Sequence, residues 1–121
     1  MRLFVLLGAI NGFLAVALGA FAAHGLEGSL SQRMTETFQT GVDYQALHAV
    51  ALLVVGLLAG SAMPRLLALA GWAFFVGIVL FSGSLYLLVL SDTRWLGAIT
   101  PFGGTAFLLG WATLAWYAWR A

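Results

Sequence analysis

The chain has 121 residues, of which 63% are hydrophobic and only 7% are charged, and its mean hydropathy is +1.03. Because ordinary soluble domains carry about 25% charged residues, this composition excludes a water-soluble surface. A formal net charge of +1 gives no basic patch for nucleic acid, and the lack of cysteine excludes disulfides, thiolate metal sites and a thiol nucleophile. We therefore predict a single transmembrane domain over residues 1–121.

The first predicted transmembrane span covers residues 3–23. It contains no charged residue and matches the roughly 20 residues that a helix needs to cross the hydrocarbon core. Arg2, the apolar run and the letters AFAA imitate a signal peptide. The apolar part of a signal peptide is usually only about 7–15 residues long, so we interpret this segment as a retained span.

The next segment predicts a short helix on the membrane surface and then a second span. Ser29 and Gln32 have the spacing of a capping box. Apolar residues then recur every four positions opposite charged ones, so we expect an interfacial helix over about 30–39. The second span is predicted over 42–62, with Asp43 at its edge.

The third and fourth spans are predicted over 66–90 and 96–119. Only the letters SAMPR and SDTRW separate the last three spans, so consecutive helices should pack as antiparallel neighbours. Pro101 lies near the start of the fourth span and should shape its first turn or kink it. Backbone polar groups in lipid must be satisfied internally, so the fold class is all-α, an integral membrane four-helix bundle with short loops.

The arginines predict how this bundle is oriented. Four spans place both termini on one face, which carries Arg2, Arg65 and Arg120, whereas the other face carries Arg33 and Arg94. Basic residues are enriched on the cytoplasmic side of membrane proteins. The bias of three against two predicts that both termini lie in the cytoplasm.

Small residues predict where the helices touch. Lipid tails are as apolar as leucine, so association depends on close contact between small residues and on interhelical hydrogen bonds. Such contacts could join helices of one chain or of two copies, and the pattern leaves both open. The residues predicted at helix contacts are Gly8, Asn11, Gly12, Gly19, Gly56, Gly60, Gly103 and Gly104.

Polar side chains gather in the half of the bundle farther from the termini. At 1.5 Å per residue, His48 should lie about 10 Å below that face, and Ser82, Ser84 and Tyr86 roughly 6–12 Å below it. Every span contributes to this layer. The predicted polar cluster is His24, Tyr44, Gln45, His48, Ser82, Ser84, Tyr86 and Thr100.

This cluster has several interpretations. An ionisable group inside a span is a functional-site hypothesis, but these side chains could equally hydrogen-bond one another and lock the bundle. His24 and His48 could be axial ligands of a haem. A metal site would need Glu27 or Asp43 as a third ligand. A serine hydrolase would pair the serines of FSGSLY with a histidine base, although the segment lacks a G-x-S-x-G elbow.

Four motifs in fixed order make the chain similar to a known family. The letters GAFAAHGL, FQTGVDYQALHAVALL, LFSGSLYLL and ITPFGG resemble, over nearly the whole chain, the domain-of-unknown-function family numbered four-two-three. That family is related to the small eukaryotic transmembrane protein numbered two-five-six. Ala22 stands where the family pattern commonly has glycine. The resemblance implies four spans and a bacterial inner (plasma) membrane location, and it brings no settled activity, cofactor or catalytic residue.

Our leading hypothesis is a non-enzymatic integral membrane protein with a structural or accessory role and no cofactor. Its expected partners are membrane lipids and either a second copy or another membrane protein, with no nucleic acid. The first alternative is binding or transport of a small solute, a proton or a lipid through the polar cluster. An intramembrane enzyme or a haem protein is the more distant alternative.

Overall fold

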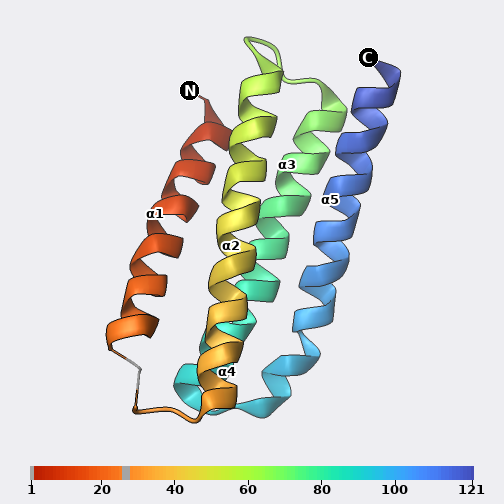
Figure 1. Ribbon diagram of the computed structural model, residues 1–121. Helices are drawn as coiled ribbons and strands as arrows, with labels where there is room; N and C mark the ends of the chain where they lie inside the picture. Colours follow the sequence, from red (N-terminus) through yellow and green to blue (C-terminus); the bar gives the residue numbers. More distant parts are fainter. Residues whose placement is uncertain (1, 26–27) are drawn as a thin grey trace.

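The computed structural model describes residues 2–25 and 28–121, and every regular element in these ranges is a helix (Figure 1). Four helical spans are long and apolar enough to cross a membrane, which confirms the predicted all-α architecture. The first two are single helices, α1 (Leu3–His24) and α2 (Gln32–Ala59). The third runs through α3 (Arg65–Gly77), the π-helical η1 (Ile78–Ser82) and α4 (Gly83–Ser91), and the fourth comprises the 3-10 helix η2 (Arg94–Ala98) and α5 (Thr100–Arg120).

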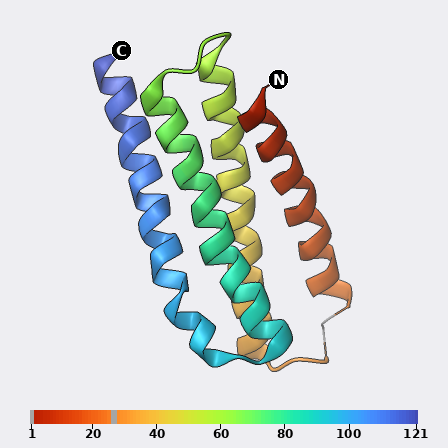
Figure 2. The same cartoon turned by 180° about the vertical axis from the view of Figure 1, so that it is seen from behind.

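The spans alternate in direction, and both chain ends lie at the same end of the bundle, which we call the termini end (Figure 1). The connection between α2 and α3 also lies there, whereas the connections from α1 to α2 and from α4 to η2 lie at the opposite end (Figure 2). The most extensive helix contacts are those of α1 with α2 and of α3 with α5. The outermost helices are therefore each held mainly by one neighbour.

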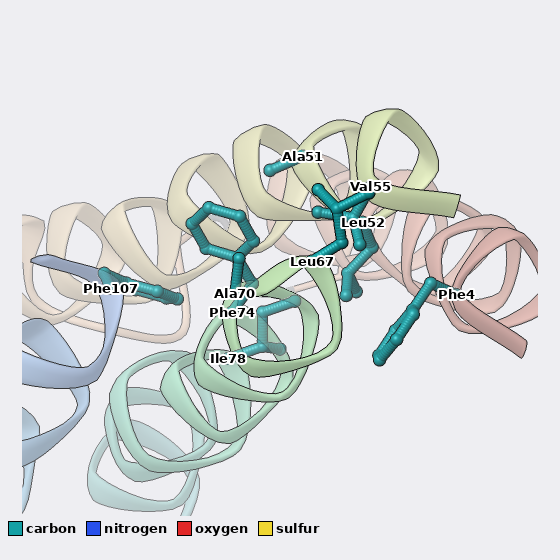
Figure 3. Packing of buried hydrophobic residues seen from close by; sticks show 9 residues of the cluster. All are labelled: Phe4, Ala51, Leu52, Val55, Leu67, Ala70, Phe74, Ile78 and Phe107. Carbon is teal, nitrogen blue, oxygen red and sulfur yellow. The ribbon is translucent and has the colours of Figure 1, made fainter. Parts of the chain in front are cut away.

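Two apolar clusters hold the bundle together at different depths. The larger one joins all four spans and includes Phe4, Leu52, Phe74 and Phe107 (Figure 3). A smaller cluster around Phe38 lies nearer the opposite end. Since Phe38 precedes and Leu52 follows the buried Gln45 and His48 along α2, the polar layer is enclosed between the two clusters.

The structure differs from the sequence expectation at the start of α2. The residues expected as a separate interfacial helix over about 30–39 form the first turns of one helix that continues to Ala59. Gly41, at the expected break, has helical backbone, and a Cβ there would lie 2.8 Å from the ring of Tyr86. The glycine therefore admits a neighbouring side chain and does not interrupt the helix.

The beginning of α2 is also two residues later than the capping-box pattern predicts. Ser31, not Ser29, is the N-cap, with extended backbone at φ −62° and ψ 157°. Its Oγ accepts a hydrogen bond from the backbone N–H of Met34 at 3.2 Å. This satisfies one of the N–H groups that a helix start leaves unpaired.

Glycines bring α1 and α2 into close contact. A Cβ on Gly8 would lie 2.8 Å from the carbonyl oxygen of Ala49, and one on Gly56 would lie 2.6 Å from the side chain of Val5. Gly19 faces a valine of α2 at 3.3 Å. These separations leave no room for a methyl group at Gly8 or Gly56 without movement of a helix.

The other glycines predicted at helix contacts differ in how close their nearest neighbours lie. A Cβ on Gly103 would lie only 2.3 Å from the backbone nitrogen of Phe81, so α5 and η1 touch there through their backbones. The nearest atom to a Cβ on Gly104 is 3.9 Å away, and Gly12 and Gly60 have open space. Gly60 instead ends α2 with a positive φ of 63°, a conformation that favours glycine.

Candidate functional site

The predicted polar residues form separate hydrogen-bonded groups that together join all four spans. One group runs from α4 through α2 to α1, a second joins α2 to α5, and two serines of the third span complete the layer. Every buried side-chain nitrogen or oxygen among the described residues has a hydrogen-bond partner. The buried polar atoms of the layer are therefore all satisfied within the bundle, a condition that we call closure.

The first group is a chain of three side chains. The hydroxyl of Tyr86 donates to Oε1 of Gln45 at 2.7 Å. Nε2 of Gln45 donates to Oδ1 of Asn11 at 2.9 Å, and Nδ2 of Asn11 donates to the carbonyl oxygen of Leu7. Gln45 and Asn11 are both buried, so each amide in this chain positions the next and links α1 to the rest of the polar layer.

The second group fixes the protonation pattern of His48. Nε1 of Trp111 lies 2.9 Å from Nε2 of His48, and an indole N–H can only donate. Nε2 must therefore carry no proton, so the neutral ring has its proton on Nδ1, which donates to the carbonyl oxygen of Tyr44 at 2.7 Å. Both ring nitrogens of His48 are engaged by these bonds.

Aromatic rings enclose His48 on the side of α5. Its ring stacks on Phe107 with centroids 3.6 Å apart and planes inclined by 7°, and Phe74 lies 5.6 Å away. Tyr44 stacks on Phe81 at 4.6 Å. The space between α2 and α5 is thus filled by side chains and not by close backbone contact.

The serines of the third span bond to other partners. Oγ of Ser82, in the π-helical segment, donates to the carbonyl oxygen of Gly41 at 2.7 Å. Oγ of Ser84 lies 2.9 Å from the carbonyl oxygen of Phe81 and 2.6 Å from Oγ1 of Thr100. Residues two apart on a helix do not share a face, so these two hydroxyls reach different helices.

Some predicted combinations are not formed. His24 is exposed at the end of α1 and makes no hydrogen bond with the other cluster residues described. Neither Ser82 nor Ser84 bonds to His48, so no serine–histidine pair is present in the described chain. Glu27 lies outside the described residues, and within them no three histidine or acidic side chains are close enough to hold a metal ion.

Three members of the layer do not follow from the sequence pattern. Trp111 belongs by composition to the apolar residues, although a buried indole N–H usually needs an acceptor, and that need is the signal that could have found it. Asn11 is predicted to contact and hydrogen-bond a neighbouring helix, which its bond to Gln45 confirms, but not to belong to the polar layer. The carbonyl of Gly41 accepts the bond from Ser82, and no side-chain pattern could reveal it because the acceptor belongs to the backbone.

A lateral cleft lies beside the polar layer, between α1 and the third span. Its volume is about 480 Å³, and α2 contributes Gln45 to its lining. Asn11, Ser82 and Tyr86 supply the other polar lining groups. The remaining lining residues are Leu7, Ile10, Leu14, Leu18, Phe75, Ile78, Val79 and Gly83.

Four apolar spans around a closed polar layer define an integral membrane protein. The chain belongs to the family described as protein of unknown function (DUF423), whose family model matches residues 18–104. This confirms the family resemblance carried by the four motifs.

The curated relatives agree with this class. The UPF0382 membrane protein YwdK of Bacillus subtilis is 51% identical over 112 residues, which cover 92% of this chain and 91% of the relative. The UPF0382 membrane protein SERP0230 of Staphylococcus epidermidis is 49% identical over 114 residues, which cover 94% and 93%. No solved structure matches the chain.

Proposed function

We propose that this chain is a non-enzymatic protein of the bacterial plasma membrane with a structural or accessory role. The observation that carries the proposal is the closure of the polar layer, in which every described buried polar side-chain atom is bonded within the bundle. A group that acts on a substrate needs a free donor, acceptor or nucleophile, and His48 has none of these free.

The bonds of the layer have a clear mechanical effect. Hydrocarbon does not drive helices together, so hydrogen bonds and close packing must fix their register. Gln45 alone joins α4 to α1 through its two amide ends. His48 and Ser82 tie the same helix to α5 and η1. The layer therefore holds α2 as the central helix of a rigid unit.

The charge distribution supports a cytoplasmic location for both termini. Arg2 precedes α1, Arg65 begins α3 and Arg120 ends α5, all at the termini end. Arg33 lies in the first turn of α2 and Arg94 begins η2, both toward the opposite end. The relatives are named membrane proteins and come from bacteria. An accessory protein in this orientation would support the membrane or a membrane-protein partner, or act as an assembly of identical copies.

Matched tyrosine variants test the structural role. Tyr86→Phe removes the hydroxyl bonded to Gln45, whereas Tyr44→Phe removes one that makes no hydrogen bond among the described residues. Each variant is measured for its amount in the membrane, its unfolding midpoint in detergent and its ability to restore a deletion strain under membrane stress. We expect restoration to fall only as far as the amount of folded protein falls. A Tyr86→Phe protein that keeps its midpoint but fails to restore the strain would contradict the proposal.

The lateral cleft supports a second candidate function, the binding of a lipid chain. Its walls are apolar, and beside it Gln45 keeps an unused N–H and an unused lone pair, while the hydroxyl oxygen of Tyr86 accepts no bond from the described residues. Val79→Trp would fill the cleft, while Val76→Trp places the same ring on an exposed position of α3 that does not line it. Loss of co-purified lipid in Val79→Trp alone, seen by native mass spectrometry, would favour lipid handling. Equal lipid in both variants would oppose it.

A further inference from the structure

Positive charge is concentrated at the termini end of the bundle without a nearby acidic side chain. Arg65 begins α3 and Arg120 ends α5, and both are exposed. No residue from 44 to 91 or from 93 to 121 is acidic. The described acidic side chains belong to the first half of α2 and to the turn after α4, toward the opposite end. The two guanidinium groups therefore have no acidic side chain on their own spans.

These arginines flank a pocket between two packed helix ends. The start of α3 and the end of α5 lie side by side (Figure 1). Residues of both helix ends line a pocket of about 300 Å³. Tyr117 also lines the pocket and is half-buried against the main apolar cluster, so its backbone is well fixed. Its hydroxyl makes no hydrogen bond within the described part of the chain, which leaves a phenolic donor beside two guanidinium groups.

The backbone adds to this donor set. The first N–H groups of a helix have no partner inside the helix. Pro64 is the N-cap of α3 and supplies no side-chain hydrogen bond. Leu66, in this first turn, lines the pocket. These N–H groups of α3 favour an anion, whereas the last carbonyl groups of α5, which ends beside the same pocket, oppose one, so the guanidinium groups must supply the attraction.

The position of the pocket indicates the kind of anion. Trp116 and Trp119, on the last turns of α5, are exposed by 54% and 84%. Tryptophan is enriched where a membrane protein meets the headgroup region. A pocket at this level, with Pro64 and Leu66 as apolar walls, is adjacent to both the phosphate and the upper acyl chain of a lipid.

We propose that this pocket binds the phosphodiester headgroup of an anionic phospholipid through Arg65 and Arg120. Guanidinium groups bind phosphate with paired, charge-assisted hydrogen bonds. Basic pockets between transmembrane helices are a known way of holding anionic headgroups. The site is separate from the polar layer, and it requires neither the structural role nor the cytoplasmic orientation of the termini.

Lipid titration of the purified full chain tests this site. The protein in neutral detergent is titrated with phosphatidylglycerol, with phosphatidylcholine and with inorganic phosphate, and bound lipid is counted by native mass spectrometry. We expect a preference for phosphatidylglycerol that falls about fivefold for Arg65→Gln or Arg120→Gln, since each arginine near an anionic headgroup contributes that much. The double variant should lose most of the preference. Circular dichroism checks that each variant is folded.

Arg94→Gln is the matched control, because Arg94 is an exposed arginine at the opposite end. It should keep the full preference, and an equal loss in this variant would overturn the proposal by showing general charge attraction. Equal binding of the two lipids by the unmodified protein would also overturn it, even if the double variant failed to fold. Inorganic phosphate that displaces the lipid at comparable concentration would show a free-anion site instead.

Discussion

The contact between α5 and η1 makes a prediction for two adjacent glycines. Gly103→Ala would place its Cβ 2.3 Å from the backbone nitrogen of Phe81 and 2.7 Å from its Cα. Gly104→Ala would place the same methyl group 3.9 Å from its nearest neighbour. Both glycines have helical backbone, so the two substitutions differ in available space and not in conformation.

The size of the effect follows from these distances. Non-bonded heavy atoms are most favourable at about 3.5–4.0 Å, so Gly103→Ala requires α5 and η1 to separate by about 1 Å. Phe81 cannot simply rotate away, because the contacted atoms belong to its backbone. Separation would also strain the 2.6 Å contact between Ser84 and Thr100. We expect a loss of about 2–3 kcal/mol in unfolding free energy, in the range of other overpacked sites.

Unfolding in mixed micelles of neutral and denaturing detergent, followed by circular dichroism, measures this loss. Gly104→Ala should not lower stability, because its Cβ meets no close neighbour and alanine is favoured over glycine in a helix by up to about 1 kcal/mol. The reasoning would be refuted if the two variants were equally stable. It would also fail if Gly104→Ala were the more damaging substitution, because the backbone contact would then not limit helix approach.

Three further outcomes are expected. Trp111→Phe removes the donor to Nε2 of buried His48 and should lower the unfolding free energy by about 1 kcal/mol. The ¹⁵N chemical shift of that nitrogen, measured by solution NMR, should change. Ser31→Ala removes the N-cap of α2 and should lower the unfolding free energy by about 1 kcal/mol. Hydrogen exchange at the Met34 amide should become faster in this variant and stay unchanged in Ser29→Ala. Fusions to alkaline phosphatase, which is active only outside the cytoplasm, test the orientation of the termini. The enzyme should be inactive when fused at the C-terminus and active when inserted between α1 and α2. The reverse pattern would refute the proposed orientation.

Span positions were predictable because they depend on local composition. A charge-free run of about 20 residues is specified by the solvent and needs no knowledge of partners. The third span, predicted over 66–90, coincides closely with the run from α3 through α4. Its π-helical segment was not predictable, because a one-residue widening of the helix leaves the hydropathy unchanged.

The polar layer was predictable in depth but not in its connections. Depth follows from counting 1.5 Å per residue along each helix. Partner choice depends on how each helix is rotated about its axis, and hydropathy gives little information on rotation when nearly every face is apolar. Hence the shared layer of Tyr86 and Gln45 could be predicted, while the bond of His48 to Trp111 could not.

The same limit explains the glycines. Gly8 and Gly12 are four residues apart and lie on one stripe of α1, yet only Gly8 meets the backbone of α2. Spacing of four predicts a shared face but not the point at which two crossing helices separate. The predicted close contact at Gly104 is absent for a related reason. Adjacent residues of a helix face different directions, and Gly103 is the one that faces Phe81.

Close glycine packing occurs in both halves of the bundle, since Gly41 meets the ring of Tyr86 and Gly103 meets the backbone of Phe81 in the half opposite the termini, and hydrogen bonds are added there. Toward the termini end the helices meet through glycine–aromatic packing, since a Cβ on Gly71 would lie 2.6 Å from the ring of Phe4. Toward the opposite end, Gln45 and Ser82 supply interhelical hydrogen bonds. Dispersion needs tight shape matching, whereas a hydrogen bond holds helices whose backbones stand farther apart. The lateral cleft lies between α1 and the third span, and Gln45 of α2 joins these two spans beside it by bonding Asn11 with one amide atom and Tyr86 with the other.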